Sequence, residues 1–100
     1  MFVKLCDKTI LPAGELKSFK IKGLEILAVN VNDRIFCLDA RCTHAGAPLA
    51  EGSVSGEVLT CPWHYSQFNI ASGDVVRGPA AKPLRTYRAE ERQNAVYVDL

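Results

Sequence analysis

Two short motifs place the chain's two histidines next to cysteines. Cys42 and His44 form a C-x-H motif, and Cys61 and His64 form a C-x-x-H motif sixteen residues further on. Residues two apart in an extended segment point to the same side, so the first pair can face one site. Pro62 favours a turn that brings the second pair onto one side of its loop. The intervening residues suffice for an out-and-back excursion, so we expect the four side chains to converge.

The arrangement of these ligands indicates which metal group they would hold. Zinc accepts two thiolates and two imidazoles, but structural zinc sites commonly take two cysteines from one arm and two histidines from the other. Here each arm supplies one of each. Mixed arms suit a group of two metals, with both cysteines on one and both histidines on the other. A [2Fe–2S] cluster of the Rieske type has this form, and zinc remains the alternative.

Charge arithmetic indicates the chemistry that such a site performs. An oxidised [2Fe–2S] core with four thiolates is a dianion, which accepts a further electron reluctantly. Two neutral imidazoles in place of two thiolates make the oxidised site neutral and easier to reduce. Rieske centres accordingly lie at about −150 to +300 mV, whereas four-cysteine ferredoxins of the plant type lie near about −400 mV. The four residues therefore predict one-electron transfer.

Composition limits the remaining possibilities. One hundred residues predict a single domain. Twelve Lys and Arg against eleven Asp and Glu give a net charge of +1, which argues against a nucleic-acid-binding protein. No signal-like or membrane-spanning apolar run is visible, so we expect a cytoplasmic protein without a membrane anchor. The other two cysteines, Cys6 and Cys37, are then expected to be reduced thiols that pack in the interior.

Apolar residues recur with a period of two, which predicts strands that position the two motifs. A helix of ordinary length fits nowhere comfortably, because five prolines interrupt the candidate windows. The short strands at regular spacing instead predict an antiparallel all-β barrel or sandwich. We expect a loop-rich subdomain over about 39–82 on a base formed by 1–38 and 83–100. The predicted turns are Asn32-Asp33, 72–74 and 93–94, and the predicted strands are 2–5, 16–21, 24–31, 34–38, 58–60, 67–70, 75–76 and 95–98.

The chain resembles the Rieske-type ferredoxins over nearly its whole length. The resemblance implies an all-β, antiparallel Rieske iron–sulfur fold with a small cluster-binding subdomain. It also implies that Cys42 and Cys61 hold an inner iron and that His44 and His64 hold an outer iron near solvent. The segments that carry the resemblance are 11–15, 32–42, 42–49, 61–64, 68–73 and 78–80.

Departures from the respiratory branch of the family place the chain in its soluble, disulfide-less branch. Ala47 and Trp63 stand where that branch has two bridged cysteines, and Phe68 stands where it has a tyrosine that donates to a ligand sulfur. Ser66 keeps the position of a serine that can donate to the cluster, and such donors raise the potential. Tyr65 stands where the family often has glycine. The predicted surroundings of the cluster are Gly46, Trp63, Ser66, Phe68 and Pro79.

The resemblance implies a one-electron carrier, expected to be a monomer, that passes electrons from a flavoprotein reductase to an oxygenase or similar redox enzyme. The alternative is a small regulatory or structural subunit of a larger oxidoreductase. An oxygenase would need a further site of two histidines and one carboxylate for mononuclear iron. Both histidines are already assigned, so the chain is not expected to be an enzyme.

Overall fold

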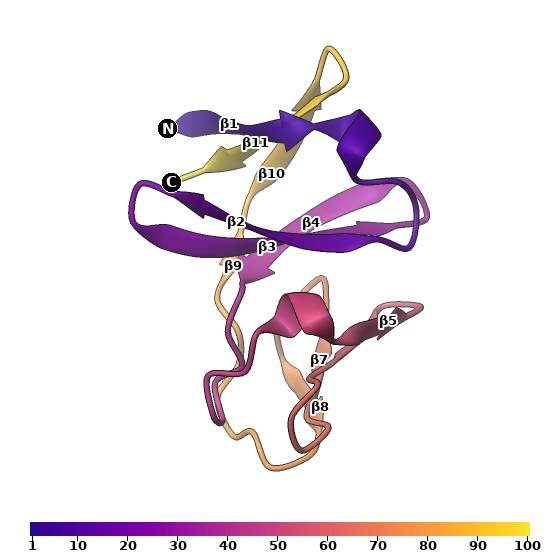
Figure 1. The fold of residues 1–100 in the computed structure, drawn as a ribbon, viewed down its shortest axis with the longest axis vertical. Coiled ribbons are helices and arrows are strands. Elements are labelled where there is room, and N and C mark those ends of the chain that lie inside the picture. The colour runs from indigo at the N-terminus through magenta and orange to yellow at the C-terminus, as the bar shows by residue number, and fades with distance from the viewer.

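Eleven strands in three antiparallel sheets make up the computed structural model, which describes residues 1–100 (Figure 1). The structure contains two short 3-10 turns and no helix with the length and apolarity that a bilayer crossing requires. The prediction of an antiparallel all-β fold is confirmed. The first sheet has the order β1 (Phe2–Asp7), β11 (Ala95–Asp99), β10 (Ala89–Arg92). The second has β2 (Leu16–Ile21), β3 (Leu24–Val31), β4 (Arg34–Asp39), β9 (Thr86–Tyr87), and the third has β5 (Ser53–Ser55), β6 (Val58–Thr60), β7 (Gln67–Asn69), β8 (Val75–Arg77).

The first two sheets, here called the base sheets, are organised around the hairpin of β3 and β4. Its tip is Asn32-Asp33, with φ of 50° and 72°, as a type I′ turn requires. Asn30 is buried beside the turn. Its Nδ2 donates to the Leu11 carbonyl at 2.8 Å, and its Oδ1 accepts the Asp33 N–H at 2.8 Å. The predicted turn is confirmed, and this amide fixes the entry to the hairpin.

β3 is the central strand of the molecule because both of its faces are buried. Ile26 and Ala28 contribute to a small core between the base sheets, with Cys37 from β4 and Val98 from β11. The alternate residues of β3, Leu27 and Val29, join a larger core that reaches into the third sheet. The large side chains that complete this core are Leu38, Leu49, Leu59, Phe68, Ile70 and Leu84. The apolar run 24–31 therefore fills two layers rather than one.

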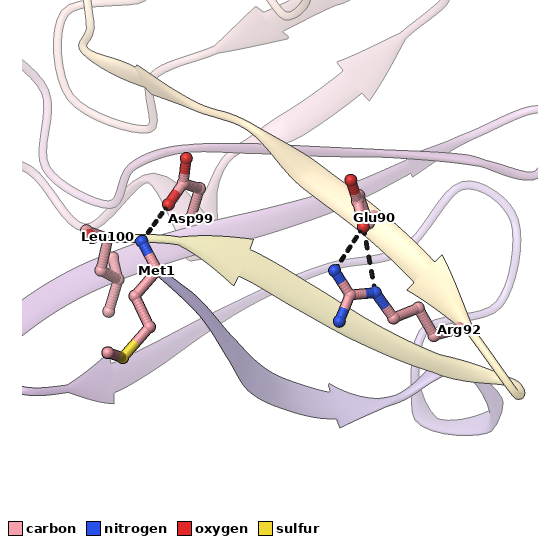
Figure 2. A network of polar contacts seen from close by, with 5 residues as sticks. All are labelled: Met1, Glu90, Arg92, Asp99 and Leu100. Atoms are coloured by element: carbon pink, nitrogen blue, oxygen red, sulfur yellow. Dashed lines mark hydrogen bonds and ion pairs between the residues drawn. The ribbon is translucent and has the colours of Figure 1, made fainter.

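The two ends of the chain close the first sheet. The Met1 amino group donates to Asp99 Oδ1 at 2.6 Å and to the Leu100 carbonyl at 3.2 Å (Figure 2). On the neighbouring strand, Arg92 Nη2 donates to Glu90 Oε2 at 2.7 Å. Exposed pairs of this kind add little stability singly, but they mark where β1, β11 and β10 lie side by side.

Three strands were not predicted from the sequence. β10 has the sequence Ala-Glu-Glu-Arg, without the alternation of apolar and polar residues that marks a half-buried strand. It forms because its backbone pairs with β11, with Glu90 opposite Tyr97. β9 has two residues, Thr86 and Tyr87, opposite β4. β5 lies in the part of the predicted loop-rich subdomain for which no strand was predicted, after the 3-10 turn η2 (Leu49–Glu51).

Candidate metal centre

Three loops gather at the end of the molecule farthest from the chain termini, at the bottom of Figure 1. The first covers residues 40–48 and is closed by an antiparallel bridge between Arg41 and Pro48. Inside it, the Cys42 N–H donates to the Ala47 carbonyl at 3.0 Å, and the Gly46 N–H donates to the Cys42 carbonyl at 2.9 Å. Gly46 has a φ of +72°, a conformation that glycine adopts without cost. These bonds form a tight turn that holds the C-x-H motif.

The second loop covers residues 61–66 and reverses the chain between β6 and β7. The Cys61 N–H donates to the Ser66 carbonyl at 2.8 Å, which closes the loop. His64 and Tyr65 both have left-handed backbones, with φ of 63° and 58°. Such conformations cost roughly 1–2 kcal/mol for a residue with a Cβ. The loop therefore maintains two consecutive unfavourable conformations while it presents the histidine.

The third loop, residues 77–84, lies against the other two. The Ala80 N–H donates to Ser66 Oγ at 3.1 Å, and Ser66 is fully buried. Thr43 Oγ1 donates to the Lys82 carbonyl at 2.6 Å, which ties this loop to the first. A Cβ on Gly78 would come within 2.7 Å of the Ser66 Cα, so only glycine permits this approach.

The two cysteines of the motifs meet beneath the loops. Cys42 and Cys61 are 4% and 1% exposed, and the Cys42 thiol lies near enough to Cys61 to affect its pKa. Burial raises the pKa of the Cys61 thiol, and the nearby Cys42 sulfur adds to the increase. A backbone hydrogen bond from Trp63 acts in the opposite direction, because an N–H directed at sulfur stabilises the thiolate.

The two histidines of the motifs also meet, on the outer side of the same loops. The ring centroids of His44 and His64 are 5.3 Å apart, with the ring planes at 82° to each other. Both residues are exposed, in contrast to the cysteines. The structure thus brings together all four of the ligands predicted from the sequence, sorted into a buried thiol pair and an exposed imidazole pair.

This donor set fits a [2Fe–2S] group. No three of the chain's His, Cys, Asp or Glu side chains gather around a point that one metal ion could occupy. Instead, like donors lie together although each comes from a different loop. Two thiolates on one iron and two imidazoles on the other is the division that a Rieske-type cluster needs.

The five residues predicted to surround the cluster occupy different positions. Ser66 and Phe68 are fully buried, and Phe68 packs in the larger core. Gly46 lies in the turn of the first loop and Pro79 is exposed on the third. Trp63 is 48% exposed, so it covers the site only in part. Sequence reasoning missed the hydroxyl of Thr43, whose position between the ligands of the C-x-H motif was the available signal.

Comparison with known proteins identifies the chain's family. The model of the Rieske [2Fe–2S] domain matches residues 1–88. The chain belongs to the Rieske [2Fe–2S] family. This Rieske domain is 33% identical to the ferredoxin component of biphenyl 2,3-dioxygenase from Rhodococcus jostii (strain RHA1), over 97% of the chain and 91% of that protein.

Solved structures support the same assignment. The Sphingomonas yanoikuyae B1 ferredoxin superposes on this Rieske domain with a TM-score of 0.93 at 29% identity, covering 100% of the chain and 99% of the other. A chain in the complex of reduced oxygenase and oxidized ferredoxin of carbazole 1,9a-dioxygenase gives 0.91 at 28% identity, covering 97% and 91%. The predicted Rieske iron–sulfur fold is confirmed, and the cofactor of the family is a [2Fe–2S] cluster.

The remaining cysteines of this Rieske domain belong to the base sheets. Cys6 and Cys37 are both buried and both free. Burial raises the pKa of the Cys37 thiol to about 12. Neither residue lies in any of the three loops, and the positions of Ala47 and Trp63 hold no cysteine that could bridge them.

Proposed function

We propose that this protein is a one-electron carrier whose cluster is held by Cys42, His44, Cys61 and His64. The observation that carries the proposal is the arrangement of the donor side chains. Two loops each contribute one cysteine to a buried thiol pair and one histidine to an exposed imidazole pair. A bound [2Fe–2S] cluster supplies reversible uptake and release of one electron. The protein would act as an electron-carrier component rather than as the enzyme, as the similar ferredoxin components of dioxygenase systems do. The chain's only two histidines are assigned to the cluster, which leaves none for a mononuclear iron site of two histidines and one carboxylate.

Each part of the site has a distinct task in this proposal. The buried thiols exclude water from one side of the cluster, and the Trp63 N–H directed at Cys61 favours the thiolate that binds metal. The exposed imidazoles form the edge through which the electron passes. Ser66 accepts the Ala80 N–H, so its hydroxyl proton is free to donate toward the cluster, which favours the reduced state.

We further propose that the electron passes from a flavoprotein reductase to an oxygenase. Several relatives that match this chain over nearly its full length are ferredoxin components of oxygenase systems. Association should be weak and rapid, since small redox complexes bury less than about 1,200 Å². We propose a monomer that works in the cytoplasm, in which segment 39–82 acts as the cluster-binding subdomain on a base of 1–38 and 83–100.

The test is to purify the protein and examine its prosthetic group. We expect a coloured protein with equal amounts of iron and acid-labile sulfide and a rhombic electron spin resonance signal after one-electron reduction with dithionite. His44→Ala and His64→Ala should each change the visible spectrum, because each removes a nitrogen ligand. A colourless or zinc-loaded protein, or a spectrum that neither substitution alters, would overturn the proposal.

A further inference from the structure

The charges of this protein are distributed unevenly between its two ends. The loops 40–48, 61–66 and 77–84, here called the tip, contain three cations, Arg41, Arg77 and Lys82. All eleven Asp and Glu residues of the chain lie outside the tip. The rest of the chain has nine Lys and Arg against those eleven acids and is therefore net negative. A nearly neutral protein thus has a positive end and a negative body.

The three cations of the tip differ in whether a nearby carboxylate already neutralises their charge. Arg41 Nε lies 3.2 Å from Glu25 Oε2, and its Nη1 donates to the Gly46 carbonyl at 3.2 Å. Arg77 and Lys82 take part in none of the protein's five ion pairs, and both are exposed. Arg77 lies opposite Gln67, next to the loop of His64, and the Lys82 carbonyl accepts the hydrogen bond from Thr43 in the loop of His44. Two uncompensated positive charges are therefore carried by residues next to the two histidine loops.

Apolar side chains are exposed at the same end. Trp63 is 48% exposed, Tyr65 is 73% exposed, and Val76, next to Arg77, is 54% exposed. Tyr, Trp and Arg are the residues most enriched in protein interfaces and at their energetic centres. Tyr65 also keeps a left-handed backbone, with φ of 58°, that a glycine would adopt at lower cost. The exposed Tyr65 ring makes no hydrogen bond within the protein that would account for this conformation.

We propose that the tip is the docking face for an acidic protein surface, with Arg77 and Lys82 as its charged rim and Trp63 and Tyr65 as its apolar centre. This inference rests on the proposed electron-carrier function and adds the chemistry of the partner. A positive rim raises the rate of encounter with a negative surface, and the effect is strongest at low ionic strength. A neutral oxidised site leaves the tip positive, and reduction by one electron offsets only one of its three cations.

Small oxidants of opposite charge test the field of the tip. The reduced protein gives one electron to ferricyanide, a trianion that becomes ferrocyanide, or to tris(phenanthroline)cobalt(III), a trication that becomes the cobalt(II) complex. In stopped-flow measurements, added salt should slow the first reaction and accelerate the second. Arg77→Glu/Lys82→Glu should lower the ferricyanide rate about tenfold at low salt and reverse its salt dependence.

A matched control distinguishes the effect of charges at the tip from the effect of the protein's net charge. Lys17→Glu/Lys20→Glu makes the same change in net charge on β2, in the base sheets, where both lysines are exposed and take part in none of the five ion pairs. This double variant should change the ferricyanide rate much less than the tip variant does. Equal effects of the two double variants, or a salt dependence that is the same for both oxidants, would show that the tip does not steer and would overturn the inference.

Two haem proteins extend the test to protein partners. Cytochrome b5 presents an acidic face and cytochrome c a basic one, and each accepts one electron. At low salt the reduced protein should transfer to cytochrome b5 with a rate that falls on adding salt, and the tip variant should abolish this dependence. Salt that slows the reaction with cytochrome c instead would contradict the proposal. The visible spectrum is recorded for every variant, so loss of the cluster, which would count against the proposed function, is distinguished from loss of steering.

Discussion

The two base sheets and the β5–β8 sheet fill their interiors in different ways. β2, β3 and β4 have six to eight residues each, and the core between the base sheets consists of ordinary apolar contacts around Ile26, Ala28 and Val98. β5 to β8 have three residues each, and the core beneath them includes the thiols of Cys42 and Cys61. On the proposed assignment, the base needs no cofactor, although its core also contains the Cys37 thiol, whereas the second region uses two of its buried thiols as cluster ligands. Metal binding in such a region contributes directly to its folding free energy.

The largest expected effect is on cluster content, when a cysteine of the second region is replaced and the result is compared with replacement of a cysteine in the base. Cys42→Ala removes a proposed ligand, and we expect the protein to retain no [2Fe–2S] absorption. Cys6→Ala removes a thiol that is also buried but lies in β1, and it should leave the iron and sulfide content unchanged. Iron analysis and visible absorption check both. Loss of the cluster in both variants, or in neither, would erase the distinction between the regions.

Ser66 and Ser72 offer a second contrast, between a buried and an exposed hydroxyl. Each Oγ accepts one backbone N–H, from Ala80 at 3.1 Å and from Asp74 at 3.2 Å. Ser66→Ala strands the Ala80 N–H in the interior and should lower the free energy of unfolding by about 1–3 kcal/mol. It should also lower the reduction potential measured by voltammetry. Ser72→Ala should change neither the free energy of unfolding nor the reduction potential appreciably. An unchanged potential in Ser66→Ala would show that the Ser66 hydroxyl does not influence the reduction potential.

Alkaline pH should destabilise the base through Cys37. Its pKa is about 12 in the folded protein, against an ordinary value of 9.0, because burial disfavours the thiolate. Between these values the unfolded chain releases a proton that the folded chain keeps. Stability is therefore fully present below about pH 9 and falls as pH rises toward 12, by up to about 1.4 kcal/mol per pH unit from this group.

Denaturant unfolding at several pH values between 8 and 11, followed by circular dichroism, measures this slope. Cys37→Ala should make it shallower. Ile26→Val, which trims the same core without removing a titrating group, should lower the stability equally at every pH. A Cys37→Ala variant with the wild-type slope would assign the alkaline loss to other groups.

The smallest effect concerns the backbone strain of the second loop. Tyr65→Gly and Tyr65→Ala both delete the exposed ring, but only glycine relieves the left-handed φ of 58°. We expect the glycine variant to be more stable than the alanine variant by about 1 kcal/mol, partly offset by the greater freedom of glycine in the unfolded chain. Thermal unfolding of the pair measures this difference. An alanine variant as stable as the glycine variant would show that the loop carries no strain at this position.

The sequence predicted most of the base because its patterns are local. The boundaries of β2 and β3 follow from alternation and from the apolar run, and Asn32-Asp33 fits the turn between β3 and β4. β10 could not be predicted in this way. Its pairing with β11 depends on the fold, and its two glutamates carry no strand signal.

At the candidate metal centre, the residue types and their spacing were sufficient to predict convergence of the four proposed ligands. The details that fix the loops were not predictable, because they are contacts between segments far apart in the chain. The bond from Thr43 to the Lys82 carbonyl and the contact of Gly78 with Ser66 each join residues that no periodicity relates. The asymmetry of charge is visible in the sequence only after the loops are known to lie together.

The meeting of Met1 and Leu100 beside Asp99 has a practical consequence (Figure 2). Residues 1 and 100 lie in the upper half of Figure 1, away from the three loops at its bottom, so a linker, an affinity tag or an entire flavoprotein joined to either residue would leave the proposed electron-transfer edge exposed. If the protein were attached to an electrode through either of these residues, its tip and the proposed metal centre would face the solution.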